Sequence, residues 1–171
     1  MASWTYWTYQ GGRWFQRYAN GKPSDVRRAL TTYNVRLMDQ EQIEALKSQG
    51  PGTLMEKMGF EWLEASSEKA VARMPVEGNT QPYGLLHGGA SACLAETLAS
   101  VGAWLADPSM ITMGIEITVN HIKAATSGWI TGTAVPLRQG KSVAVWEIRM
   151  TNDDGELTAF STCTIAIKKA R

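Results

Sequence analysis

Scarcity of charge and of long hydrophobic runs limits the classes of protein to which this sequence can belong. Charged residues make up 19% of the 171 residues, and the net charge is +1. A nucleic-acid-binding protein needs a strongly basic face, so we expect no nucleic-acid partner. No run approaches the roughly 20 apolar residues that cross a bilayer, and the opening stretch, MASWTYWTYQGG, lacks the apolar block of a signal peptide. The sequence therefore predicts a cytoplasmic protein without a membrane partner.

Cysteine and histidine are too few, and too far apart, for the usual metal and redox motifs. Cys93 and Cys163 are 70 positions apart, and His87 and His121 are 34 positions apart. Neither spacing matches the ligand clusters of a zinc site or a redox pair, and the G-x-S-x-G motif of serine hydrolases does not occur. We therefore expect no metal site, and we interpret both cysteines as small core residues.

The composition divides the chain into an aromatic N-terminal extension, residues 1–35, and a body, residues 36–171. The extension has five basic residues against one acidic residue, whereas the body has a net charge of −3. Aromatic residues flank two glycines in TYWTYQGGRWFQRY, which predicts a two-stranded hairpin with Tyr9 opposite Trp14. An isolated hairpin is marginally stable, so the extension is either a packing element or a lid or docking arm, and the sequence leaves both open.

The body is long enough for one hydrophobic core, and its residue patterns give the order of its elements. A capped helix is predicted over residues 38–49, followed by two strands around a turn at residues 66–69. A long apolar helix then covers residues 90–106, and four strands follow, at residues 111–122, 129–137, 142–150 and 157–168. A helix with hardly any polar face must be covered on most sides, so we expect an antiparallel sheet curled around it. This α+β architecture is called the hot-dog fold.

Two polar residues interrupt these apolar patterns. In the strand over residues 111–122, strict alternation of apolar residues places His121 on the core-facing side. Glu96 lies in the middle of the apolar helix, with no Lys or Arg within one turn and with Ser100 on the same helical face. Burying a carboxylate costs several kcal/mol unless it is paired or neutralised. We therefore expect Glu96 at a cleft or an interface with a function.

The start of the long helix predicts a site for negative charge. Gly88 and Gly89 leave their backbone N–H groups unshielded at the positive end of the helix dipole, where an oxyanion could develop. Glu96 lies eight residues after Gly88, which is roughly 12 Å along the axis at 1.5 Å per residue. One chain cannot easily place both groups on one carbonyl. Two antiparallel copies of the helix in a symmetric dimer would bring them together.

Three segments carry a resemblance to a known family: QPYGLLHGGASACLAETLASVGAW, GIEITVNHIKAA and RQGKSVAVWEI with the strand that follows it. They resemble the hot-dog acyl-CoA thioesterases of the 4-hydroxybenzoyl-CoA type, over about residues 36–168. Within that family they are most similar to the branch that contains 1,4-dihydroxy-2-naphthoyl-CoA hydrolase, an enzyme of menaquinone biosynthesis. The resemblance implies hydrolysis of an aryl- or acyl-CoA thioester by a homotetramer built from dimers. It implies no metal and no cofactor, since coenzyme A is part of the substrate.

The resemblance also implies roles for individual residues. Glu96 would be the nucleophile or general base, and Gly88 would be the oxyanion donor. Gln81 and His87, six residues apart, would flank the thioester. The two other implied residues are a water-holding serine and a histidine that lines the acyl pocket: Ser100 and His121. Independently of the resemblance, three basic residues at strand ends are candidates for binding the phosphates of coenzyme A: Lys123, Arg138 and Lys141.

Several alternatives stay open. The acyl group could be presented by an acyl carrier protein instead of coenzyme A, and the same basic residues could then meet the acidic carrier. A non-catalytic hot-dog domain would bind acyl-CoA without turnover. His87 could simply cap its own helix, and the basic residues could simply be solvated.

Overall fold

The computed structural model describes residues 3–10, 13–20, 46 and 51–169. They belong to two compact units, Met1–Arg36 and Leu37–Arg171. In the first unit, strands β1 (Ser3–Gln10) and β2 (Arg13–Asn20) pair in antiparallel orientation. Their register places Tyr9 opposite Trp14, as the glycine pair between them predicts.

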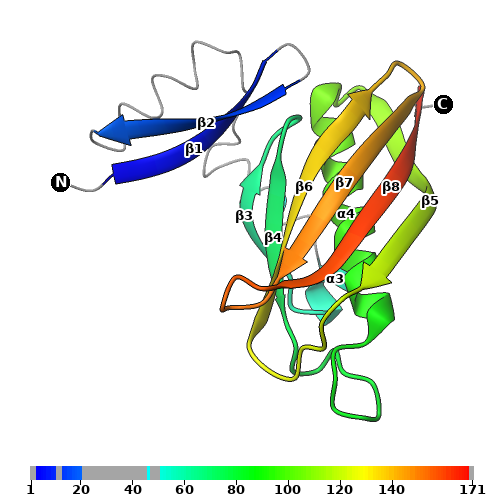
Figure 1. Ribbon diagram of the computed structural model, residues 1–171. Helices are drawn as coiled ribbons and strands as arrows, with labels where there is room; N and C mark the ends of the chain where they lie inside the picture. Colours follow the sequence, from blue (N-terminus) through cyan, green and yellow to red (C-terminus); the bar gives the residue numbers. More distant parts are fainter. Residues whose placement is uncertain (1–2, 11–12, 21–45, 47–50, 170–171) are drawn as a thin grey trace. The chain divides into compact units, whose positions relative to one another are not determined.

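The second unit is built on a six-stranded sheet with the strand order β3-β4-β6-β7-β8-β5. The strands are β3 (Glu61–Ala65), β4 (Ala70–Pro75), β5 (Met110–His121), β6 (Trp129–Gln139), β7 (Val143–Thr151) and β8 (Leu157–Lys169). Every neighbouring pair is antiparallel. β5 forms one edge of the sheet, next to β8 (Figure 1). The predicted strands are thus confirmed, and among the described strands β5 pairs with β8 alone, which leaves its other edge open.

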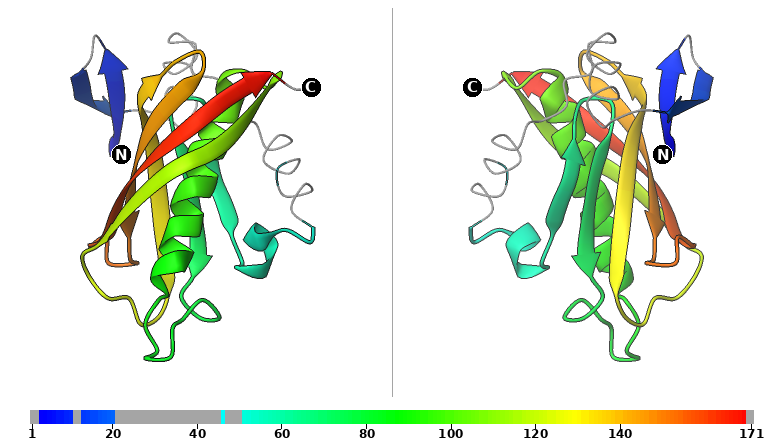
Figure 2. Two further views of the ribbon diagram at one scale, coloured as in Figure 1. Left: turned by 90° about the vertical axis from the view of Figure 1, so that its right-hand side faces the viewer. Right: turned by 90° about the vertical axis from the view of Figure 1, so that its left-hand side faces the viewer.

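Helix α4 (Gly88–Ala106) lies along the concave face of this sheet (Figure 2). Its covered side includes Leu94 and Leu98, which are fully buried. Small residues let the helix approach the strands closely: a Cβ added to Gly102 would lie 2.7 Å from Cζ3 of the Trp146 ring. Close packing of α4 on a curved sheet confirms the predicted hot-dog fold.

The edge strand β5 contains a bulge that reverses its faces. Its pairing with β8 shifts register between Gly114 and Glu116, and an extra residue in a strand turns the following side chains to the other face. Beyond the bulge, Ile117 and Val119 pack against the core. Before it, three apolar side chains are 45, 42 and 61% exposed: Ile111, Met113 and Ile115. The prediction of strict alternation was therefore wrong for the first half of the strand.

Two further segments complete the description. The predicted helix over residues 38–49 lies outside the described residues, apart from Leu46, which is helical and buried. A short helix that the residue pattern did not predict, α3 (Leu54–Lys57), begins at Thr53, whose side chain accepts the Glu56 N–H at 3.5 Å. In the part of the chain that is described, no helix has the length and apolar character needed to cross a membrane.

Candidate active site

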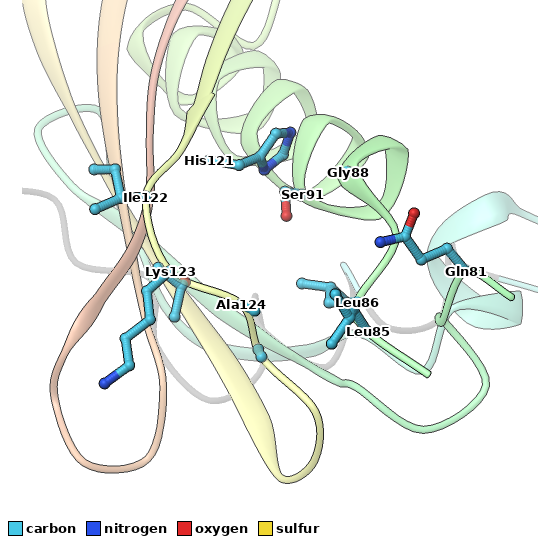
Figure 3. Close-up of a pocket in the computed structure, with 11 residues that line it drawn as sticks. Gln81, Leu85, Leu86, Gly88, Ser91, His121, Ile122, Lys123 and Ala124 are labelled. Atoms are coloured by element: carbon cyan, nitrogen blue, oxygen red, sulfur yellow. The ribbon is translucent and has the colours of Figure 1, made fainter. Parts of the chain in front are cut away.

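The loop before α4 is held in place by Asn79. Its side-chain Nδ2 donates to two backbone carbonyl oxygens, each at 2.9 Å. Its own carbonyl oxygen accepts the His87 N–H at 2.8 Å. Between Asn79 and His87 the chain reverses at Gly84, whose φ of 74° lies in the left-handed region that favours glycine. These contacts position Gln81 close to the start of the helix (Figure 3).

His87 caps α4 with both its side chain and its backbone. Its Nδ1 accepts the Gly89 N–H at 2.8 Å. Its carbonyl oxygen accepts the N–H groups of Ala90 and Ser91, at 2.9 and 3.4 Å. Of the N–H groups in this first turn, that of Gly88 alone has no hydrogen-bond partner among the described residues. The open donor at the helix start is therefore Gly88, whereas the Gly89 N–H that the sequence also suggested is already bonded.

A pocket of about 370 Å³ opens at the start of α4 (Figure 3). Its walls come from the loop before the helix, the first turn of the helix, the end of β5 with the segment after it, and the start of β8. The lining residues are Gln81, Leu85, Leu86, Gly88, Ser91, His121, Ile122, Lys123, Ala124, Ala125 and Thr158. The structure thus brings together four predicted site residues, Gln81, Gly88, His121 and Lys123. His87 is not among the lining residues, and its capping bond is the structural role that the sequence left open.

His121 faces the first turn of α4. If a Cβ is built on Gly88, it lies 2.7 Å from Nε2 of His121. The imidazole therefore forms one wall of the pocket directly beside the open N–H. The prediction that His121 turns toward the helix side of the sheet is confirmed, although the residue is exposed in the single chain.

Ser91 is a pocket residue that the sequence interpretation missed. It is 3% exposed and lies in the first turn of the helix, and its side-chain oxygen points into the pocket (Figure 3). One signal in the sequence could have found it. A helical residue three positions after Gly88 lies on the same face as that glycine, so a serine there is directed to the same site.

Glu96 and Ser100 lie further along α4, away from this pocket. Glu96 is exposed in the single chain, and its carboxyl carbon would be 2.9 Å from a Cβ added to Gly114 of β5. The sheet covers only one side of the helix, so one chain leaves this carboxylate exposed. The interface at which the sequence places Glu96 stays a prediction. Ser100 is partly buried, and its carbonyl oxygen accepts a hydrogen bond from Thr112 Oγ1 at 3.0 Å.

The three basic residues considered for phosphate binding lie at opposite ends of the sheet. Lys123 lines the pocket, with its Nζ 2.5 Å from Oε2 of Glu156. Hydrogen bonds from Lys123 and from Asn152 lower the pKa of Glu156. Arg138 and Lys141 lie at the far end of β6 and in the turn after it. Of these three residues, one chain presents only Lys123 to the pocket.

The two cysteines differ in burial. Cys163 is fully buried on β8, and burial, assisted by the negative charges of Glu96 and Glu116, raises the pKa of its thiol to about 12. Cys93 is half-buried on α4, and burial raises its pKa despite a hydrogen bond with Thr97. Both thiols are therefore neutral at neutral pH, and the interpretation as a core residue holds fully for Cys163.

Comparison with known proteins adds independent findings. The family model of the thioesterase superfamily matches residues 83–159, which include α4 and the strands that hold the pocket. The 1,4-dihydroxy-2-naphthoyl-CoA hydrolase of Listeria monocytogenes is 43% identical over 120 residues, covering 69% of this chain and 98% of that protein. The proofreading thioesterase EntH of Cronobacter turicensis is 38% identical over 127 residues, covering 73% and 93%. The crystal structure of a mutant thioesterase from Pseudomonas aeruginosa superposes with a TM-score of 0.72 at 32% identity, covering 78% of this chain and 96% of that one.

Proposed function

Because this chain belongs to the thioesterase superfamily, we propose that it hydrolyses an aryl- or acyl-CoA thioester to the free acid and coenzyme A. As a member of that superfamily with the hot-dog fold, it is a thioester hydrolase. One observation supports the proposed place of the reaction. The N–H of Gly88, which has no partner among the described residues, lies at the positive end of α4, beside a pocket of about 370 Å³. That arrangement suits a carbonyl oxygen that gains negative charge.

In this proposal the thioester carbonyl oxygen binds the Gly88 N–H. As the carbonyl carbon becomes tetrahedral, the oxygen gains negative charge, which the N–H and the helix dipole stabilise. Gln81 and His121 line the same pocket and would hold the thioester from two sides. Of the two histidines, His121 lines the pocket, so we assign to it the contact with the departing sulfur. His87 fixes the helix start through its bond to Gly89.

Glu96 would reach this carbonyl from a second copy of the chain. α4 runs antiparallel to β5, so Gly88 lies beside His121 and Glu96 lies beside Gly114. β5 is an edge strand, and such an edge is a template for pairing with another strand. If two copies pair through β5 about a two-fold axis near Ile117, midway between Gly114 and His121, each Glu96 comes beside the other copy's Gly88. The apolar side chains exposed before the bulge support contacts with further copies, in a homotetramer built from dimers.

Glu96 then acts on the carbonyl carbon in one of two ways. As a nucleophile, its carboxylate displaces the thiolate and forms an anhydride, which water cleaves. As a general base, it takes a proton from a water molecule whose oxygen attacks the carbon. Both routes break the carbon–sulfur bond, form a carbon–oxygen bond and release a thiolate that takes up a proton. Ser100, one helical turn from Glu96, would hold the water.

The acyl group that we favour is aromatic. Support comes from the Listeria relative, whose name specifies a dihydroxynaphthoyl group. This substrate would place the enzyme in menaquinone biosynthesis, in the cytoplasm. Coenzyme A is part of the substrate, and the proposed steps use neither a metal nor a separate cofactor. Its phosphates would meet Lys123 at the pocket, together with Arg138 and Lys141 of another copy.

Two alternatives use the same pocket. An acyl carrier protein could deliver the acyl group on its phosphopantetheine arm, with its acidic surface against the basic residues. A non-catalytic domain would bind the CoA thioester and leave it intact. The first alternative keeps the chemistry and changes the carrier, whereas the second removes the role of Glu96.

A hydrolysis screen with the full chain separates these functions. Thiol release would be measured with aromatic, branched and straight-chain CoA esters and with a carrier-protein thioester. We expect the highest kcat/KM with an aromatic CoA ester, and a kcat at least about 10²-fold lower for Glu96→Gln. A preference for the carrier-protein thioester would select the first alternative. Tight binding of CoA thioesters without release of thiol would select the second.

A further inference from the structure

Ser91 places a hydroxyl group deep in the pocket. The residue is 3% exposed, and Figure 3 shows its side-chain oxygen directed into the pocket, with His121 and Gly88 on either side. Within the described ranges this hydroxyl has no hydrogen-bond partner. We infer that Ser91 donates a hydrogen bond to the thioester carbonyl oxygen, as the second donor beside the Gly88 N–H. This inference rests on the proposed function, because it assigns a residue to the same carbonyl.

The first turn of α4 has no second backbone donor to offer. The Gly89 N–H is bonded to Nδ1 of His87, and the next two N–H groups are bonded to the His87 carbonyl oxygen. Oxyanion sites in acyl transfer commonly combine two or more donors around one oxygen. A second donor fixed on the helix itself must therefore be a side chain, and Ser91 is the helical residue whose side chain lines the pocket.

Helix geometry puts the two donors at a suitable separation. Ser91 follows Gly88 by three residues, a rise of about 4.5 Å along the axis. Helical side chains lean toward the N-terminus, which brings the Ser91 hydroxyl back toward the level of Gly88. Two donors about 4 to 5 Å apart can both approach one oxygen at about 2.9 Å. The His121 ring, packed against Gly88, closes one side of this space.

The other buried hydroxyl in the pocket wall is already used. Oγ1 of Thr158, which is 4% exposed, donates to the Met150 carbonyl oxygen at 3.1 Å. Ser91 has no comparable bond, so its hydroxyl is free to donate to a ligand. Its oxygen is not one of the fully enclosed side-chain atoms without a partner in the described part of the chain, which are Trp146 Nε1 and Ser161 Oγ. The Ser91 hydroxyl therefore faces the open space of the pocket, where a substrate can reach it.

This assignment predicts opposite effects on activity and stability, which a purely structural serine would not show. In the full chain, Ser91→Ala should lower kcat by about 10²-fold, the lower end for one oxyanion donor, with KM changed less than about threefold. The unfolding temperature of the same variant should stay equal or rise, because no protein hydrogen bond is lost. Ser91→Thr keeps a hydroxyl and should recover part of the lost kcat.

Ser161→Ala is the matched control. Ser161 is fully buried, its hydroxyl has no partner among the described residues, and it does not line the pocket, so the kcat of Ser161→Ala should stay at the wild-type value. An unchanged kcat for Ser91→Ala would overturn the inference, as would an equal loss for Ser161→Ala. A loss confined to acyl groups that carry a hydroxyl would also overturn it, because the partner would then be the acyl substituent. If the wild-type chain hydrolyses no thioester at all, the proposed function itself fails. That result differs from failure of the Ser91 assignment, in which the wild type is active and Ser91→Ala is equally active.

Discussion

The imidazole of His121 occupies the space that a side chain at position 88 would fill. A Cβ built on Gly88 would lie 2.7 Å from Nε2 and 3.2 Å from Cε1 of that ring. Glycine is therefore required there by tertiary packing, since this residue is helical and its φ is not in the left-handed region. The same contact keeps the imidazole beside the open N–H at the start of α4.

Gly88→Ala should push the His121 ring away and partly close the pocket. We expect kcat/KM for the best CoA ester to fall by about 10²-fold, the scale of losing one aligned oxyanion donor. Steady-state kinetics would measure this loss, and circular dichroism would check that the fold is retained. In Gly88→Ala combined with His121→Ala the clash is relieved. If the clash causes the loss, this double variant should be about as active as His121→Ala alone. A double variant that is still about 10²-fold less active than His121→Ala would show that the clash is not the cause.

Mixed oligomers should recover activity when two inactive variants are combined. If each site joins Gly88 of one copy to Glu96 of another, an oligomer of Glu96→Gln and Gly88→Ala subunits contains sites in which both residues are intact. Refolding the two variants together should then give turnover well above that of either variant alone. Each variant refolded separately is the control. Failure to recover activity, with subunit mixing verified by mass spectrometry, would mean that the site lies within one chain.

Gly102→Ala should destabilise the fold without altering the site. An added methyl group would meet the Trp146 ring, which is fully buried between α4 and the sheet. Overpacking of a core typically costs 1–3 kcal/mol, so we expect a loss of about 2 kcal/mol in the free energy of unfolding. Urea denaturation would measure it. Ala99→Gly, at a nearby buried helical position, provides a contrast. It should also destabilise the fold, but through the low helix propensity of glycine and without a clash at Trp146.

Ionisation of Cys163 should weaken the fold at high pH. The folded pKa of this thiol is raised to about 12, above the value of about 8.5 in an unfolded chain. Its contribution to stability is therefore complete below about pH 8.5 and is lost as the pH rises toward 12. The free energy of unfolding of the wild type, relative to Cys163→Ala, should fall by up to about 1.4 kcal/mol per pH unit in that window. A constant difference between pH 8 and pH 11, set by denaturation at each pH, would contradict the prediction.

Much of the fold could be predicted from residue patterns because it depends on local chemistry. The apolar run ending at Ala106 and the alternation along β7 have the periods of a helix and a strand. The register of β1 and β2 follows from the two glycines between them. Gly88 could be identified because small residues at a helix start leave N–H groups open. Each of these inferences uses only residues that are neighbours in the sequence.

The site depended more on distant contacts. The bulge in β5 exposes Ile115 and was not visible in the alternation. Glu96 has apolar neighbours in the sequence, yet the sheet covers only the other side of the helix, so one chain leaves its carboxylate exposed. Ser91 looked like an ordinary small helical residue, and its role emerges from the pocket around it.

The sequence by itself determined the hot-dog order of elements, the glycine start of α4 and the position of the lone glutamate along that helix. The tertiary structure decided which polar groups are left without partners. It packed His121 against Gly88, left the Gly88 N–H without a partner among the described residues and turned the Ser91 hydroxyl into the pocket. The physical reason is that periodicity and capping act over a few adjacent residues. Whether a donor is satisfied depends instead on every atom that the fold brings within about 3 Å of it.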